Sequence, residues 1–333
     1  MKLFKMLAFL LTGVLLGGII LTGCENKGAV IAVVNGDKIY EKELNNMLAG
    51  LYGADAKATE AEKESIYESL INSKLIEQEC KKRKLDVSKD DIEAYMQEVI
   101  KANGVESKEA FYEQLRTTYG YNKEFVDDLI KGSLEEKALY EDVISTEVKE
   151  DEALIKKTYD ENPAKFKLVE VSHILISLEE SESEAAALAK AKSLIARLAT
   201  GEDFAAMAKA NSDDTGSAVN GGLLTGYFGA DNTSYVAEFV AASVKLNAGE
   251  YTKEPVKSQF GYHIIKANGV KSGFDDADVK NYVTESVYAP LREKAFTDFL
   301  EKLEKAADIE RKLEFDLEKD EETAETQETV EIQ

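Results

Sequence analysis

Residues 171–176 read Val-Ser-His-Ile-Leu-Ile, and residues 260–266 read Phe-Gly-Tyr-His-Ile-Ile-Lys. These two apolar segments contain both histidines of the 333-residue chain, His173 and His263. Burying a histidine costs free energy unless the ring is hydrogen-bonded, and neighbouring strands of one sheet can supply each ring with a partner. We therefore expect a sheet that brings the two imidazoles together. The alternative for either ring, taken singly, is a hydrogen-bonded residue of the core.

The sequence around the two histidines mixes strand and helix patterns. Strand alternation places His173 on the face of Val171 and Leu175, and His263 on the face of Ile265. Mixed elements of this kind predict a compact α+β domain. The expected strands cover 168–176, 251–256 and 262–267, the expected helices cover 182–199, 203–210 and 236–243, and a glycine-rich stretch covers 216–229.

The flanking sequence is helical. Apolar residues recur at helical spacing over 41–149, after a short hairpin at Asn35-Gly36, and again beyond Gly273. Pro163 separates the first helical part from the α+β domain, because the residue before a proline disfavours helix. We therefore predict an all-helical lobe interrupted by an inserted α+β domain. The expected boundaries are 24–165 for the helical lobe, 166–271 for the inserted domain and 272–313 for a C-terminal helix packing on the lobe.

The N-terminus has the pattern of an export signal. Lys2 and Lys5 precede an apolar stretch that is short for a membrane span and ends in Leu-Thr-Gly-Cys at residues 21–24. This ending resembles a bacterial lipobox, which implies removal of residues 1–23 and lipid on Cys24. The chain would then be anchored by lipid to the outer face of the cell membrane. The alternative is an uncleaved anchor helix that contains a cysteine.

Charge and cysteine content exclude several classes of protein. The formal net charge of −23 argues against nucleic acid as a partner and against direct binding to anionic lipid. Residues 314–333 contain nine acids and one lysine, so we expect a disordered acidic tail there. With Cys24 lipidated, Cys80 is left without a disulfide partner, and we expect it to be a buried packing residue. One free cysteine and two distant histidines do not make a zinc site, and we expect no metal.

Four stretches in the α+β domain together resemble the parvulin family of peptidyl-prolyl isomerases. They are Val-Ser-His-Ile-Leu at 171–175, Phe-Ala-Ala-Met-Ala-Lys-Ala-Asn-Ser-Asp-Asp at 204–214, Gly-Gly-Leu-Leu at 221–224, and Phe-Gly-Tyr-His-Ile-Ile at 260–265. The resemblance implies a four-stranded antiparallel sheet with helices, and catalysis of the cis/trans isomerisation of X–Pro bonds. That reaction requires no nucleophile and no cofactor.

Residue by residue, the resemblance implies a catalytic group of His173, His263 and Asp214. The two rings would stand side by side and share a hydrogen-bond network. Asp213 is the neighbouring alternative, and it more often matches the structural aspartate of the motif. The loop after the first strand, 177–184, is acidic and would repel phosphate, which argues against phospho-dependent recognition.

The same resemblance implies an apolar pocket for proline formed by Leu224, Tyr235 and Phe239, with Ser258 and Phe260 at its rim. Two departures affect this assignment. The chain reads Gly-Gly-Leu-Leu-Thr-Gly at 221–226 where family members usually read Gly-Gly-Asp-Leu-Gly, and the segment up to Phe239 is longer than usual. A tyrosine in place of the usual methionine predicts a narrower or more polar pocket.

Taken whole, the chain resembles the PrsA-type foldase lipoproteins, with a helical lobe similar to that of SurA-like chaperones. This implies a membrane-anchored protein that helps exported proteins fold, whose lobe holds unfolded clients while the parvulin domain isomerises their X–Pro bonds. A second hypothesis is a holdase whose parvulin domain binds peptide without significant catalysis. A third, a lipid-anchored solute-binding protein, fits poorly because such proteins usually have two α/β lobes. The sequence leaves the oligomeric state open, and a homodimer is compatible with it.

Overall fold

The computed structural model describes residues 28–52, 58–181 and 183–317. The described residues form two compact units. One contains those up to Lys149 together with those from Arg292 onward, and the other contains residues 150–291. The proposed signal segment and Cys24 lie outside the described residues. None of the described helices is sufficiently long and apolar to cross a membrane.

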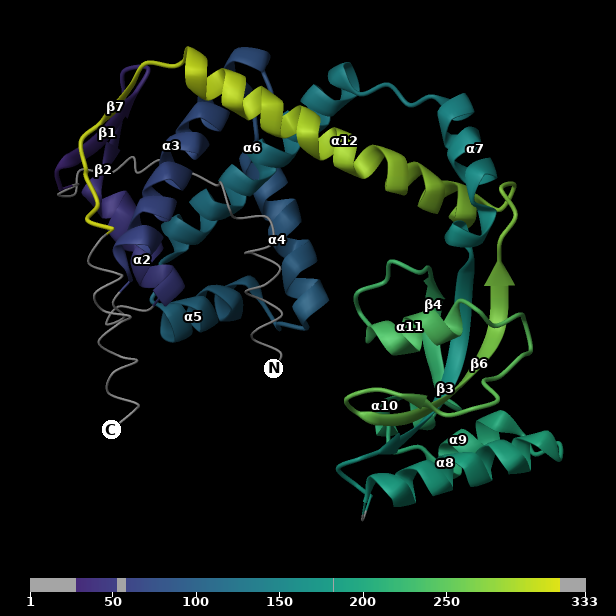
Figure 1. Cartoon of the computed structure of the whole chain (residues 1–333). Coiled ribbons are helices and arrows are strands. Elements are labelled where there is room, and N and C mark those ends of the chain that lie inside the picture. Colours follow the sequence, from purple (N-terminus) through teal and green to yellow (C-terminus); the bar gives the residue numbers. More distant parts are fainter. Residues whose placement is uncertain (1–27, 53–57, 182, 318–333) are drawn as a thin grey trace. The chain divides into compact units, whose positions relative to one another are not determined.

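The first unit is built mainly of helices (Figure 1). Its side-chain caps include Ser88 and Ser107, whose hydroxyls accept backbone N–H groups at the starts of the helices Lys89–Asn103 and Lys108–Tyr119. Its elements are β1 (Val30–Val34), β2 (Asp37–Tyr40), α2 (Glu41–Tyr52), α3 (Glu60–Arg83), α4 (Lys89–Asn103), α5 (Lys108–Tyr119), α6 (Lys123–Glu147), the C-terminal half of α12 (Ala277–Ala306) and β7 (Ile309–Arg311).

A small sheet in the order β2-β1-β7 joins the beginning and the end of this unit. The predicted hairpin turn is confirmed, with positive φ at Asn35 (49°) and Gly36 (90°). Strand β7 pairs antiparallel with β1 and is not apparent in the sequence, because three residues are too few for an alternation pattern. Beyond it, Phe315 packs on Tyr67 with ring centroids 5.5 Å apart, so packed structure extends into the first residues of the stretch 314–333.

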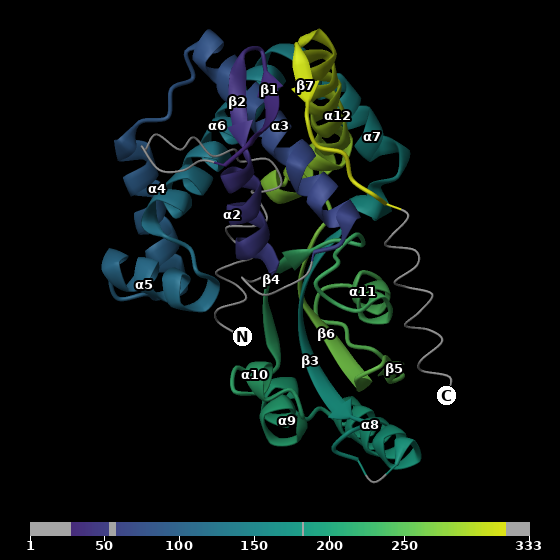
Figure 2. The same cartoon turned by 90° about the vertical axis from the view of Figure 1, so that its left-hand side faces the viewer.

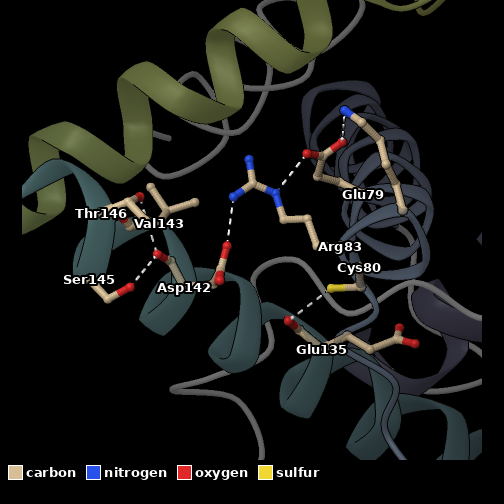
Figure 3. Close-up of polar contacts among 9 residues, drawn as sticks. Glu79, Cys80, Arg83, Glu135, Asp142, Val143, Ser145 and Thr146 are labelled. Carbon is tan, nitrogen blue, oxygen red and sulfur yellow. Dashed lines mark hydrogen bonds and ion pairs between the residues drawn. The ribbon is translucent and has the colours of Figure 1, made fainter.

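Helices α3, α6 and α12 meet in the first unit (Figure 3). The Arg83 guanidinium donates to Glu79 on its own helix and to Asp142 on α6, both at 2.7 Å, and lies 4.7 Å from the ring centre of Phe299 on α12. Cys80 is 1% exposed and donates its S–H to the Glu135 carbonyl. Burial raises the pKa of its thiol to about 12, which agrees with the predicted packing role.

The second unit contains a four-stranded sheet with helices, as expected for the α+β domain (Figure 2). Pro163 begins a short 3-10 helix directly after α7, in agreement with the break predicted there. The elements are α7 (Glu152–Glu161), η1 (Pro163–Phe166), β3 (Leu168–Ser177), α8 (Glu184–Ala199), α9 (Phe204–Asn211), α10 (Thr215–Ala218), β4 (Leu223–Phe228), α11 (Ala237–Ser243), β5 (Val256–Lys257), β6 (Gly261–Lys271) and the N-terminal half of α12.

The sheet is antiparallel in the order β4-β3-β6-β5. One face carries Ile174 and Ile264 against α8 and α9, and the other carries Val171 and Ile265 against Phe239 of α11. Two sequence expectations were inaccurate. The glycine-rich stretch contains β4, which was missed because its sequence, Leu-Leu-Thr-Gly-Tyr-Phe, has apolar residues at both ends and no alternation. The strand expected at 251–256 is reduced to β5 and one bridge from Tyr251.

Candidate active site

The structure brings the two histidines together on one face of the sheet. Strands β3 and β6 pair so that His173 lies opposite Ile265 and His263 lies opposite Leu175, which places the two imidazoles diagonally. Their ring centroids are 5.6 Å apart with an interplanar angle of 17°, and their Nδ1 atoms are 3.4 Å apart. Both rings are buried.

Asp214 is the N-cap residue of the short helix α10. One carboxylate oxygen, Oδ2, is 2.7 Å from Nε2 of His173 and accepts a hydrogen bond from the Ser217 hydroxyl. The other oxygen accepts the backbone N–H of Gly216. Burial raises the pKa of Asp214, but the hydrogen bonds from Ser217 and His173 outweigh it and hold the pKa below its usual value.

The hydrogen-bond partners assign the proton of each ring. A carboxylate only accepts, so His173 carries its proton on Nε2 and leaves Nδ1 free to accept the Nδ1–H of His263. Nε2 of His263 then accepts the hydroxyl of Ser258 at 2.7 Å, and the Ser258 oxygen in turn accepts the N–H of Phe260. The result is a chain of hydrogen bonds in one direction, from Ser258 through both rings to Asp214.

The neutral state of His263 agrees with its surroundings. Burial lowers its pKa to about 4, and the neighbouring His173 lowers it further, against a smaller opposite effect of Asp214. His263 is therefore neutral at neutral pH, as the direction of the hydrogen-bond chain from Ser258 to Asp214 requires.

An apolar cavity of about 700 Å³ opens beside the two rings. Phe239 is 2% exposed, and its ring is roughly perpendicular to both imidazoles, at centroid distances of 5.5 Å and 5.3 Å. Phe260 stands at the mouth and is 54% exposed. The cavity is lined by His173, Leu175, Asp213, Asp214, Thr215, Leu224, Thr233, Ser234, Tyr235, Val236, Phe239, Phe260 and His263.

Most of the residues chosen from the sequence lie at this cavity. The rings of Tyr235 and Phe239 are tilted against each other with centroids 5.5 Å apart, and Leu224 packs on the same cluster. Ser258 is placed differently, because it lies behind His263 and is not among the lining residues. Asp213 accepts the backbone N–H of Ser177 at 2.8 Å, so it ties its loop to the end of β3.

Sequence reasoning missed Ser217, which contacts both His173 and Asp214. The signal that could have found it is its spacing, because a serine three residues after an N-cap aspartate lies on the first turn of the helix. The described residues contain no group of three His, Cys, Asp or Glu side chains arranged to hold a metal ion.

Comparison with known proteins supports the resemblance stated from the sequence. Residues 153–271 match the family model of the PPIC-type PPIASE domain, and residues 2–139 match that of the SurA-like N-terminal domain. The chain is 31% identical over 320 residues to the foldase protein PrsA of Caldanaerobacter subterraneus, covering 88% of this chain and 92% of that protein.

Two solved structures are also similar to the chain in sequence. The crystal structure of PrsA from Bacillus subtilis is 27% identical, covers 85% of this chain and 94% of its own, and has a TM-score of 0.31. The solution structure of NmPin, the parvulin of Nitrosopumilus maritimus, is 43% identical, covers 31% of this chain and 97% of its own, and has a TM-score of 0.24. On the curated relatives and the family models, the chain belongs to the PrsA family of foldases and contains a peptidyl-prolyl isomerase domain of the PPIC type.

Proposed function

We propose that the chain is a membrane-anchored extracytoplasmic foldase that isomerises X–Pro bonds in exported proteins. The observation that carries the proposal is the hydrogen-bonded pair of His173 and His263, with Asp214, in the wall of an apolar cavity of about 700 Å³. This combination provides an apolar surface for a proline ring and polar groups for the amide that precedes it.

The cavity favours rotation of an amide because its apolar wall excludes water. Partial double-bond character gives the X–Pro bond a rotation barrier of about 18–20 kcal/mol. Water stabilises the charge-separated planar amide, so transfer of the bond to the apolar wall of Leu224, Tyr235 and Phe239 weakens that preference. A wall that holds the proline ring while the preceding carbonyl turns binds the twisted state more tightly than the planar one.

The polar groups of the cavity set the electrostatic field at the carbonyl that precedes the proline. His173, His263 and Asp214 line the cavity and are fixed by their mutual hydrogen bonds, so they need little reorganisation as the amide twists. A nucleophilic Asp214 is disfavoured, because its carboxylate already accepts hydrogen bonds from His173, Ser217 and Gly216. Ser258 acts through His263, because its hydroxyl donates a hydrogen bond to Nε2 of that ring.

The remaining parts of the proposal concern the client and the anchor. The helical first unit would hold unfolded exported chains, and lipid on Cys24 would retain the protein at the outer face of the membrane. Replacing Cys24 with Ala should release the protein into the medium and abolish incorporation of labelled palmitate.

Sedimentation of the chain without its anchor tests the homodimer that the sequence leaves open.

The decisive experiment measures cis-to-trans isomerisation of X–Pro tetrapeptides by the chain from residue 25 onward. We expect catalysis by the parent chain and its loss in His173→Ala. Phe260→Ala should weaken peptide binding, whereas Leu154→Ala, which truncates another exposed side chain of the same unit, 40% exposed on α7, should not.

The holdase alternative gives a different pattern. A folded parent chain that suppresses client aggregation yet leaves the tetrapeptide rate unchanged would remove the isomerase part of the proposal. Equal client folding by the parent chain and by His173→Ala would then assign the foldase role to the helical lobe.

A further inference from the structure

Ser217 is buried beside the two groups that the mechanism uses. It lies on α10, is 6% exposed, and its hydroxyl oxygen is 3.2 Å from Nε2 of His173. The same hydroxyl donates to Oδ2 of Asp214. Ser217 is not among the residues described as lining the cavity, so it would act on a bound peptide through its neighbours.

The three side chains form a triangle with fixed directions. The hydroxyl hydrogen of Ser217 is directed to the carboxylate, so a lone pair of its oxygen faces the Nε2–H of His173. The proton of His173 is therefore shared between two acceptors, Asp214 and Ser217. Because Oδ1 of Asp214 accepts from Gly216, the carboxylate is held at both oxygens and cannot turn away from the ring.

The backbone of Ser217 is joined to the backbone of His173 as well. Its carbonyl accepts the N–H of Gly222 at 2.9 Å, and the carbonyl of Gly222 accepts the N–H of His173 at 2.8 Å. Gly222 has φ of +79°, and a Cβ there would lie 2.1 Å from the His173 carbonyl oxygen. This close approach fixes the distance between α10 and β3, and with it the distance from the Ser217 hydroxyl to the ring.

We propose that Ser217 is a positioning residue of the isomerase site, which holds Asp214 against His173 and thereby sets the direction of the hydrogen-bond chain through both histidines. Its kinetic consequence rests on the proposed isomerase function, but its effect on the two rings does not. Without the hydroxyl, Asp214 loses a donor and becomes more basic, and the order of protons along the chain is no longer fixed.

Long-range ¹H–¹⁵N spectra of the imidazoles test this directly in the chain from residue 25 onward. The spectrum is simple because the chain contains two histidines. In the parent we expect His173 protonated at Nε2 and His263 protonated at Nδ1. In Ser217→Ala we expect mixed tautomers on both rings, and in Ser217→Thr, which keeps the hydroxyl, the parent pattern.

Kinetics provide the second measurement. We expect Ser217→Ala to lower kcat about tenfold, the size of effect expected for loss of one hydrogen bond to a charged group. KM should change less than about twofold, because Ser217 does not line the cavity. Protonation of Asp214, which limits activity on the acid side together with protonation of His263, should move to higher pH without the hydroxyl. Ser217→Thr should reverse both changes.

The outcomes separate this inference from the proposed function. Unchanged tautomers in Ser217→Ala overturn the positioning role, whatever the rates are. Altered tautomers in Ser217→Ala, with no isomerisation even by the parent chain, support the positioning role and overturn the isomerase function. If Ser217→Thr does not fold, the comparison of the parent with Ser217→Ala still decides, because that variant removes one buried oxygen atom and adds none.

Discussion

The candidate active site and helix α6 of the helical lobe both contain partly or fully buried ionisable side chains, and their carboxyl pKa values shift in opposite directions. In the site, Asp214 and His263 have hydrogen-bond partners, and their pKa values lie below the ordinary ones. On α6, Oδ2 of Asp128 is buried without a hydrogen-bond partner among the described residues. Burial first, and nearby Glu124 second, raise the pKa of Asp128 to about 7, and burial raises that of Glu136 to about 7.

The two aspartates teach that hydrogen-bond partners decide the direction of the shift, because Asp214 has them and its pKa is lowered, whereas Asp128 has a buried oxygen without one and its pKa is raised. For His263, burial itself lowers the pKa, because burial disfavours the charged form of a base. A raised carboxyl pKa stabilises the fold below the unfolded value of about 4 and loses that contribution as pH rises toward 7. A lowered histidine pKa has the opposite effect on the pH dependence of stability. The stability that depends on neutral His263 is lost as pH falls from about 6.5 toward 4. Acidification should therefore favour the lobe at α6 and disfavour the isomerase site.

The largest effect on the isomerisation rate is expected when two aspartates are replaced and their variants are compared. Asp214→Ala should reduce kcat/KM about a hundredfold, because His173 loses the acceptor that fixes its tautomer. Asp128→Ala, the same truncation on α6, should leave the rate for a tetrapeptide unchanged. Peptide isomerisation by both variants provides the test. Equal losses would mean that the rate reports general stability and not the site.

A second comparison uses two buried phenylalanines. Phe239→Leu should raise KM and lower kcat/KM roughly tenfold, because the smaller side chain leaves part of the proline site unfilled. Phe111→Leu, in the core of the lobe, should lower thermal stability without changing either constant. Kinetics and melting of both variants provide the measurement, and unchanged kinetics in Phe239→Leu would remove that residue from the pocket.

A third effect is confined to the lobe and depends on pH. Asp128→Asn removes a charge that is costly to bury, so it should raise the free energy of local opening of α6 by about 1–2 kcal/mol at pH 8, after allowance for its partial exposure. At pH 4.5, where the folded parent carboxyl is already protonated, the difference should be much smaller. Hydrogen exchange of α6 amides measures both values.

Glu98→Gln, an exposed change on the neighbouring helix α4, is the matched control for that experiment. It should leave α6 protection unchanged at either pH. A gain of equal size at both pH values in Asp128→Asn would show that the amide forms a new contact, and the titration argument would not hold.

The sequence predicted some features of the candidate active site from local pattern and others only from resemblance to a family. The strands that carry His173 and His263 are nearly continuous apolar runs, so they were recognised as strands, and the period of two along each strand predicted the face of each ring. Leu224, Tyr235 and Phe239 were located by resemblance to a family, since nothing in their own spacing indicates a pocket. The structure places these three at one cavity, and their role in binding proline stays a prediction.

The features that escaped prediction depend on contacts between distant segments. Strand β7 has three residues, and its pairing with β1 arises only when the chain returns from α12. The unsatisfied oxygen of Asp128 depends on how α4 and α6 pack, which periodicity does not determine. Ser217 was missed because its importance comes from the position of His173 on another element.

The smallest expected effect is the near-constancy of catalysis above pH 5. His263, with a pKa of about 4, and Asp214, with a lowered pKa, keep the same protonation across this range, so their titration should change kcat/KM less than about twofold between pH 5.5 and 8. Activity should then fall as pH approaches 4, when His263 gains a proton and can no longer accept from Ser258. A pH profile of tetrapeptide isomerisation measures this, with circular dichroism at each pH to show that the chain stays folded. An acid limb at which His263 titrates near 6.5 would mean that this ring is not held neutral by its surroundings, and the hydrogen-bond chain would not be the state that catalyses.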